Sequence, residues 1–173
     1  MENRSNNILA FIPQNKEGEL VLKEALYFQQ ILGMQIIVLN VIKAPSFFSR
    51  KFRTKEIERL EYEEKQKLSN FVKNVIKREI PKDITIKVKT GEIVSTLIKE
   101  SEKRKYEFII VDKSKSSFRG QLHWNKIDKF VSQSHCPVLA INRDFPVRDI
   151  KKIIIPIDIS QSTNKRLWWA SLF

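Results

Sequence analysis

Five short apolar runs alternate with amphipathic stretches along most of the chain. The runs lie at 7–13, 34–42, 84–90, 107–112 and 138–142. Each has the length and residue types of a strand, and the run at 34–42 is nearly continuous in apolar residues, as in strands buried on both faces. Strands that alternate with helices predict a parallel sheet covered by helices on both faces. The predicted fold class is therefore α/β, with an open, mostly parallel five-stranded sheet.

Stretches with helical periodicity separate these runs. They lie at 17–32, at about 54–79, after Gly91 and at 123–134. The second stretch predicts a long helix, with Thr54 as its N-terminal cap and Pro81 as the residue that terminates it. The first half of this helix is mostly polar, so Glu61, Glu63 and Glu64 are assigned to a wet helix face rather than to acid–base chemistry. The run ITIKVKT, at 84–90, alternates apolar and polar residues, which predicts a strand near an edge of the sheet.

Cysteine content and hydropathy indicate the compartment. The single cysteine, Cys136, excludes an internal disulfide and fits a reducing compartment. The N-terminal residues lack the long apolar stretch of a signal peptide, and no window has the apolar length of a membrane span. We therefore expect a cytoplasmic protein that does not enter a membrane.

The net charge of +12 raises the possibility of a polyanion-binding protein. The densest basic runs are at 51–55 and 103–105, and no nucleic-acid motif accompanies them. A lysine-rich, solvated surface is the preferred interpretation, and a nucleic-acid partner is not predicted.

No catalytic or metal-binding residues are predicted. His123 and His135 are the only histidines, and neither has the spacing of a catalytic triad. His135 stands beside Cys136, but a metal motif needs a second pair of cysteines or histidines, which the chain lacks. The glycine-rich phosphate-binding motifs of dinucleotide-binding and Walker-type proteins are also absent. Whether the protein is an enzyme stays open from the residues, and the absence of a candidate nucleophile argues against it.

The last 23 residues repeat the pattern with which the chain begins. KKIIIPIDISQS, from 151, aligns with NNILAFIPQNKE, from 6, so that a strand matches a strand and a helix start matches a helix start. This internal repeat predicts one domain at 1–143, a polar linker at 144–150, and the first strand and partial helix of a second copy at 151–173.

These motifs resemble the universal stress protein family. KIIIPIDIS is similar to the ILVPVD-like strand that opens the family's domains, and HCPVLAIN to the CPVLVV ending that closes them. FIIVD, at 108–112, is similar to the family's DLIVMG-like strand. The resemblance implies a Rossmann-like fold of the adenine-nucleotide alpha hydrolase type. It also implies a tandem protein whose second domain is truncated in this chain.

In family members that bind ATP, an Asp follows the first strand and a glycine-rich loop holds the phosphates. Here Pro13 stands in place of the Asp, and Gly120 is the single glycine in the loop after FIIVD. The resemblance therefore implies no cofactor in the first domain. Ser114, Lys115 and Ser116 are the remaining candidates for a side-chain contact with a phosphate, although a solvated loop is the simpler interpretation.

The second copy keeps the family's aspartate as Asp158, preceded by Pro156 and Ile157. By resemblance, these three residues are candidate nucleotide ligands, and the complete second domain is expected to bind ATP or AMP. Asp158 is equally suited to capping a helix.

The leading hypothesis is a stress-response regulatory protein that binds partners without turnover. The resemblance implies a homodimer that forms through the edge strand Val138–Asn142, or contact with a protein partner that the sequence does not identify. An adenine-nucleotide-dependent enzyme of the same fold and a basic polyanion-binding protein are the alternatives.

Overall fold

The computed structural model describes residues 5–43, 53–103, 105–113, 124–142 and 154. Strands and helices alternate along these residues, as the sequence predicts. The elements are β1 (Asn7–Phe11), α1 (Lys16–Leu32), β2 (Gln35–Ile42), α2 (Arg53–Ile76), β3 (Ile84–Thr90), α3 (Ile93–Ser101), β4 (Phe108–Asp112), α4 (Trp124–Gln133) and β5 (Val138–Ile141).

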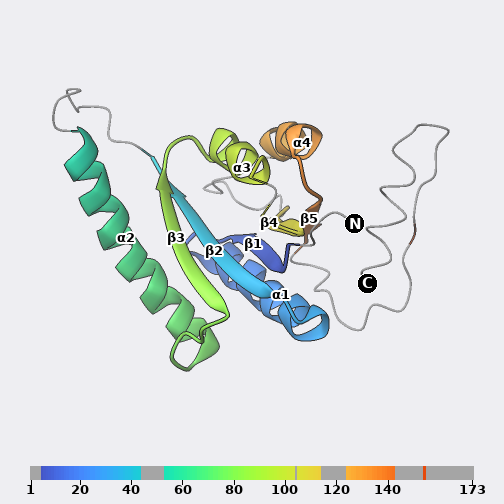
Figure 1. The fold of residues 1–173 in the computed structure, drawn as a ribbon, viewed down its shortest axis with the longest axis horizontal. Helices are drawn as coiled ribbons and strands as arrows, with labels where there is room; N and C mark the ends of the chain where they lie inside the picture. Colours follow the sequence, from blue (N-terminus) through green and yellow to red (C-terminus); the bar gives the residue numbers. More distant parts are fainter. Residues whose placement is uncertain (1–4, 44–52, 104, 114–123, 143–153, 155–173) are drawn as a thin grey trace.

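The strands form one parallel sheet in the order β3-β2-β1-β4-β5 (Figure 1). β1 lies in the middle, with Ile8 opposite Ile36 of β2 and opposite Phe108 of β4. β3 and β5 are the two edges. The predicted α/β fold class and the predicted edge position of β3 are therefore confirmed. The predicted linker and second copy lie outside the described residues, except for Ile154.

Each face of the sheet is covered by two helices. The chain steps from β1 to β2 to β3 in one direction, and from β4 to β5 in the other. Right-handed crossovers in opposite directions place their helices on opposite faces. α1 and α2 accordingly pack on one face, and α3 and α4 on the other. Because successive side chains of a strand alternate, Ile8 and Ala10 of β1 enter the first core, and Leu9 and Phe11 the second.

Helix α1 begins and ends at residues suited to those positions. Asn15 caps the N-terminus, where its Oδ1 accepts the N–H of Gly18 at 3.1 Å. Gly33 ends the helix with a φ of 66°, and its N–H donates to the carbonyl of Gln29 at 2.9 Å. A left-handed residue at this place favours glycine.

Helix α2 differs from its prediction at both ends. The helix already begins at Arg53, so Thr54 lies inside the first turn and is not the cap. It ends at Ile76 rather than near residue 79, because Lys77 takes a φ of 55°. A left-handed residue stops the helix before Pro81 is reached.

Among the helices of the described residues, none combines the length and the hydropathy needed to cross a bilayer.

Candidate functional site

The change of crossover direction lies between β1 and β4, at the middle of the sheet (Figure 1). In open α/β sheets, ligands bind beyond the carboxyl ends of the strands at this switch point. The residues that follow β1 and β4 therefore form the first candidate site.

The carboxyl end of β1 turns tightly into α1. Pro13 is buried, and its carbonyl accepts the N–H of Asn15 at 2.9 Å. A Cβ on Gly18 would lie 1.7 Å from that carbonyl oxygen and 2.9 Å from Cγ2 of Ile12. The first turn of α1 therefore packs directly on the end of β1, and Pro13 contributes neither a carboxylate nor an amide N–H.

The N-terminus of α1 offers little to an anion. Asn15 already accepts the N–H of Gly18, one of the donors that a helix N-terminus leaves unpaired. Glu17 and Glu19 lie in the first turn, where their carboxylates face the positive end of the helix dipole. Both carboxylates compete with an added anion for this end of the helix, and Glu19 also pairs with Lys23 at 2.7 Å.

The carboxyl end of β4 is tied to the neighbouring edge strand. The N–H of Lys113 donates to the carbonyl of Ile141 at 2.8 Å, and Asp112 and Lys113 are both half-buried. The candidate phosphate contacts Ser114, Lys115 and Ser116 follow directly, and they lie outside the described residues. The candidate nucleotide ligands Pro156, Ile157 and Asp158 also lie outside them.

A second group of polar side chains lies at the carboxyl ends of β2 and β3. Glu61 of α2 accepts the backbone N–H of Thr90 at 2.7 Å. One turn further along α2, Glu64 accepts from Nε2 of Gln14, in the loop after β1, at 3.1 Å. The interpretation of α2's acidic residues as a wet face is therefore wrong for Glu61 and Glu64. It is correct for Glu63, which is exposed.

Two buried oxygens accompany this second group. Asn40 of β2 is 4% exposed, and its Oδ1 has no hydrogen-bond partner among the described residues. The same holds for Oγ1 of Thr90. A buried polar atom without a partner costs about 1–3 kcal/mol.

A buried ion-pair cluster ties β3 to α3. Glu100 is 2% exposed, and its carboxylate accepts from Lys87 at 2.6 Å, from Lys103 at 2.5 Å and from the Tyr106 hydroxyl at 2.8 Å. Burial alone raises the pKa of Glu100, but these three donors outweigh it and lower the pKa to about 2. Burial and the carboxylate raise the pKa of Tyr106, and burial lowers that of Lys87. The cluster fixes the C-terminal end of α3 against the sheet.

The sequence contains a signal for the buried position of Glu100, which the list of apolar residues on α3 leaves out. Ile93, Leu97 and Glu100 follow one another at spacings of four and three, so the glutamate continues the apolar face of α3. A charged residue on a buried face needs partners, and its position could have indicated the cluster.

The single cysteine is not activated. Burial raises the pKa of Cys136 to about 11, although Ser134 beside it acts in the opposite direction. A thiol with a raised pKa is a poor nucleophile at neutral pH. His135, beside it, is exposed, and its backbone N–H donates to Oγ of Ser101 at 3.1 Å. Within the described ranges, no group of three or more His, Cys, Asp and Glu side chains is placed to hold a metal.

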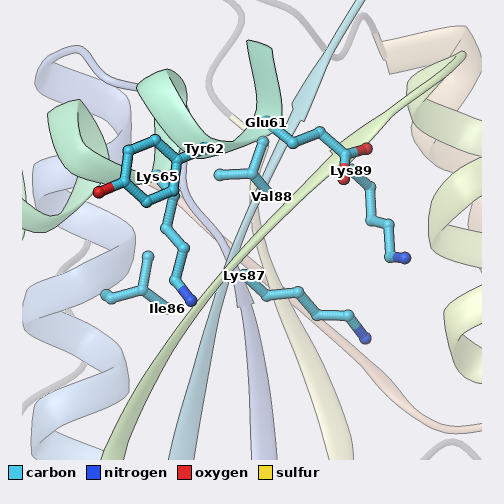
Figure 2. A pocket seen from close by; sticks show the side chains of 7 residues that line it. All are labelled: Glu61, Tyr62, Lys65, Ile86, Lys87, Val88 and Lys89. Atoms are coloured by element: carbon cyan, nitrogen blue, oxygen red, sulfur yellow. The ribbon is translucent and has the colours of Figure 1, made fainter. Parts of the chain in front are cut away.

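A shallow groove of about 250 Å³ runs between α2 and the edge strand β3 (Figure 2). It is lined by Glu61, Tyr62 and Lys65 of α2 and by residues 86–89 of β3. Figure 2 shows Ile86 and Val88 on the side of β3 that faces α2, with Lys87 and Lys89 extending to the other side. No sequence pattern predicts this groove, because its two walls are more than 20 residues apart in the chain.

Comparison with known proteins agrees with this architecture. The model of the universal stress protein family matches residues 5–142. The chain therefore belongs to the universal stress protein family. The comparison with curated proteins gave no match.

Solved structures of universal stress proteins share the fold. The protein from Lactobacillus plantarum is 15% identical with a TM-score of 0.59, over 81% of this chain and 99% of that one. One from Archaeoglobus fulgidus DSM 4304 is 21% identical with a TM-score of 0.66, over 98% of this chain and 63% of that one. A universal stress protein in complex with cAMP is 14% identical with a TM-score of 0.54, over 78% of this chain and 95% of that one.

Proposed function

We propose that this member of the family acts as a binding module without catalytic turnover, and that its first domain does not hold an adenine nucleotide at the switch point. One observation carries the proposal. The end of β1 is occupied by its own chain, since the Pro13 carbonyl contacts Gly18 and bonds to Asn15. A nucleotide that depends on a carboxylate at position 13 would meet a proline there.

Calorimetric titration with ATP, AMP and cAMP tests this proposal. We expect dissociation constants of about 1 mM or weaker, because a nucleotide without this carboxylate would keep only weak contacts. A Kd of about 1 mM corresponds to a binding free energy of about −4 kcal/mol. Pro13→Asp should not restore binding, since the close packing of Gly18 against residue 13 remains. Micromolar affinity of the unaltered chain would overturn the proposal, and sustained ATP hydrolysis would favour an enzyme of the same fold.

We further propose that a second domain begins at 151 and that Asp158, with Pro156 and Ile157, contacts ATP or AMP there. The internal repeat supports it, as does the similarity to the Archaeoglobus fulgidus DSM 4304 protein over 98% of this chain. In a chain extended by the rest of that domain, Asp158→Ala should abolish ATP binding. Asp128→Ala, an exposed change on α4, is the control.

We also propose that two copies associate through the edge strand at Val138–Asn142. The carbonyls of Pro137 and Ile141 accept hydrogen bonds from β4, at 2.9 and 2.8 Å, so the peptide group of Ala140 points away from the sheet. An unpaired edge strand is a template for another chain. Ala140→Pro removes one outward N–H and should convert a dimer into a monomer in sedimentation at tens of micromolar. A wild-type monomer under these conditions would contradict the proposal.

A further inference from the structure

The groove between α2 and β3 lies along an edge of the sheet (Figure 2). An edge strand presents backbone N–H and C=O groups that no neighbouring strand satisfies. The hydrogen bonds around β3 determine which of these groups remain open.

Hydrogen bonds near the carboxyl end of β3 fix the direction of its peptide groups. The N–H of Gly91 donates to a carbonyl of β2 at 2.8 Å, whereas that of Thr90 donates to the Glu61 carboxylate at 2.7 Å. Because successive peptide groups point to opposite sides of a strand, those of Ile86 and Val88 point away from β2, as that of Thr90 does. Within the described part of the chain, no hydrogen bond engages the outward groups of Ile86 and Val88.

The two ends of this edge are already satisfied from within the chain. The Glu61 carboxylate accepts the Thr90 N–H as a carbonyl of a neighbouring strand would. At the other end, the carbonyl of Pro81 accepts the N–H of Ile84 at 3.1 Å. Two residues with outward groups remain between them, which leaves room for an extended segment of about four residues.

The side chains around these open groups are apolar and cationic. Tyr62 is 64% exposed and lies on the α2 side, next to the nearly buried side chains of Ile86 and Val88. Lys65 and Lys89 line the same groove, and neither forms an ion pair with any described residue. The third lysine of the groove is neutralised by Glu100, as described above. The groove therefore complements a segment that carries both apolar and acidic side chains.

We propose that the β3 edge binds an extended acidic peptide, which adds to the sheet as a short further strand. Its backbone would pair with Ile86 and Val88. Its side chains would alternate, with apolar ones toward Tyr62 and acidic ones toward Lys89. Backbone pairing supplies the affinity, and the lysines supply the preference for acidic residues.

The probe is an acetylated, amidated and fluorescent six-residue peptide in which aspartate and valine alternate. It should bind with an affinity that falls as salt rises. A peptide in which lysine replaces aspartate should not bind. A third peptide, with the same charges but with every backbone nitrogen methylated, should also fail, because neither of its edges can donate a hydrogen bond along the strand.

Three substitutions locate the site. Lys89→Glu should weaken binding about fivefold, the upper range for one exposed ion pair, and Lys65→Glu about twofold, because Lys65 lies on the α2 side and attracts the acidic residues only at longer range. Glu61→Ala should strengthen binding about threefold, because it opens the Thr90 N–H and removes a like charge. Lys129→Glu, an equal change of charge on the exposed side of α4, is the matched control and should leave binding unchanged.

Amide hydrogen exchange distinguishes strand addition from charge attraction alone. With saturating peptide, the amides of Ile86 and Val88 should exchange at least about tenfold more slowly. The amides of Lys87 and Lys89 already face β2, so their exchange should change much less.

Four results would overturn the proposal. The first is that the peptide does not bind at millimolar concentration, and the second is that it binds without slowing exchange at Ile86 and Val88. The third is that oligothymidylate binds the groove more tightly than the peptide, which would assign the site to nucleic acid. The fourth is that these two amides become protected as protein concentration rises without peptide, which would assign the edge to a second copy of the chain. All four are independent of ATP titration.

Discussion

At the end of β1, the Pro13 carbonyl, the Asn15 N–H and the Asn15 side chain are all engaged within one turn of the chain. Gly18 packs so closely against that carbonyl that a side chain at position 18 would collide with it. Along the edge of β3, by contrast, the outward groups of Ile86 and Val88 have no hydrogen bond to any described residue, and they lie beside two lysines that form no ion pair with the described residues. In the first region the polar groups are paired within the chain, whereas in the second they remain able to form hydrogen bonds and ion pairs.

This difference shows that, among the described residues, the open backbone groups lie at an edge of the sheet and not in the turn after β1. The switch point is the expected place in an open α/β sheet. The residues after β1 form one half of this place, and here they cap a helix and pack against it. Fold alone does not determine where a protein binds.

The largest effect is expected from Gly18→Ala, which targets the closed region. The added Cβ would collide with the Pro13 carbonyl, so the free energy of unfolding should fall by about 3 kcal/mol. Urea denaturation measures this loss. Gly33→Ala is the control, since it meets only the cost of a left-handed φ, about 1 kcal/mol. Equal losses at the two glycines would mean that β1 and α1 are not in close contact.

Glu100→Gln tests the ion pair that ties β3 to α3, on the face of the sheet opposite α2. It leaves Lys87 without its buried partner, and at pH 7 it should lower the free energy of unfolding by about 2 kcal/mol. The pKa of Glu100 is about 2 in the folded protein, below its ordinary value of 4.5. As pH falls through this window, the unfolded state takes up the proton first, so stability is lost.

Denaturation at a series of pH values between about 5 and 2 should therefore show a steeper fall for the wild-type protein than for Glu100→Gln. Parallel curves would show that the carboxylate does not hold its charge through these contacts. Glu102→Gln, an exposed position on the same helix end, serves as the control.

Much of this architecture follows from sequence patterns, whereas the polar contacts do not. Periods of two and 3.6 residues predict the strands and helices because they reflect which side chains face a core. The end of α2 depends on a left-handed Lys77, and lysine gives no signal for that conformation. Glu61 and Glu64 resemble any solvated helix residue until the fold brings Thr90 and Gln14, 29 and 50 residues away, into contact.

The candidate nucleotide residues illustrate a different limit. Pro13 departs from the family's pattern in the sequence itself, and its packing gives that departure a physical meaning. The positions of Ser114, Lys115, Ser116 and Asp158 remain predictions from resemblance alone.

Glu61→Ala tests how the edge of β3 is closed at its carboxyl end. Loss of a carboxylate that accepts a backbone N–H should cost about 1 kcal/mol in the free energy of unfolding. Glu63→Ala removes only an exposed ion pair with Arg59 and should cost about 0.3 kcal/mol. Thermal denaturation of both variants gives the comparison, and indistinguishable midpoints would argue against the bond to Thr90.

Thr90→Val should have the smallest effect. It replaces a buried hydroxyl without a described partner by a methyl group of similar size. The free energy of unfolding should rise by up to about 1 kcal/mol, because the substitution removes a buried oxygen without a hydrogen-bond partner. A loss above about 1 kcal/mol would mean that a water or ligand satisfies this oxygen in solution.

One NMR experiment compares the two regions most directly. A single isotopically labelled sample is titrated first with ATP and then with the alternating aspartate–valine peptide, while backbone amide shifts are followed. We expect no saturable shifts at Asn15 and Gly18 with ATP, and saturable shifts at Ile86 and Val88 with the peptide. Saturable shifts at Asn15 and Gly18 at micromolar ATP, with none at Ile86 and Val88 on adding peptide, would contradict both the closed switch point and the open edge.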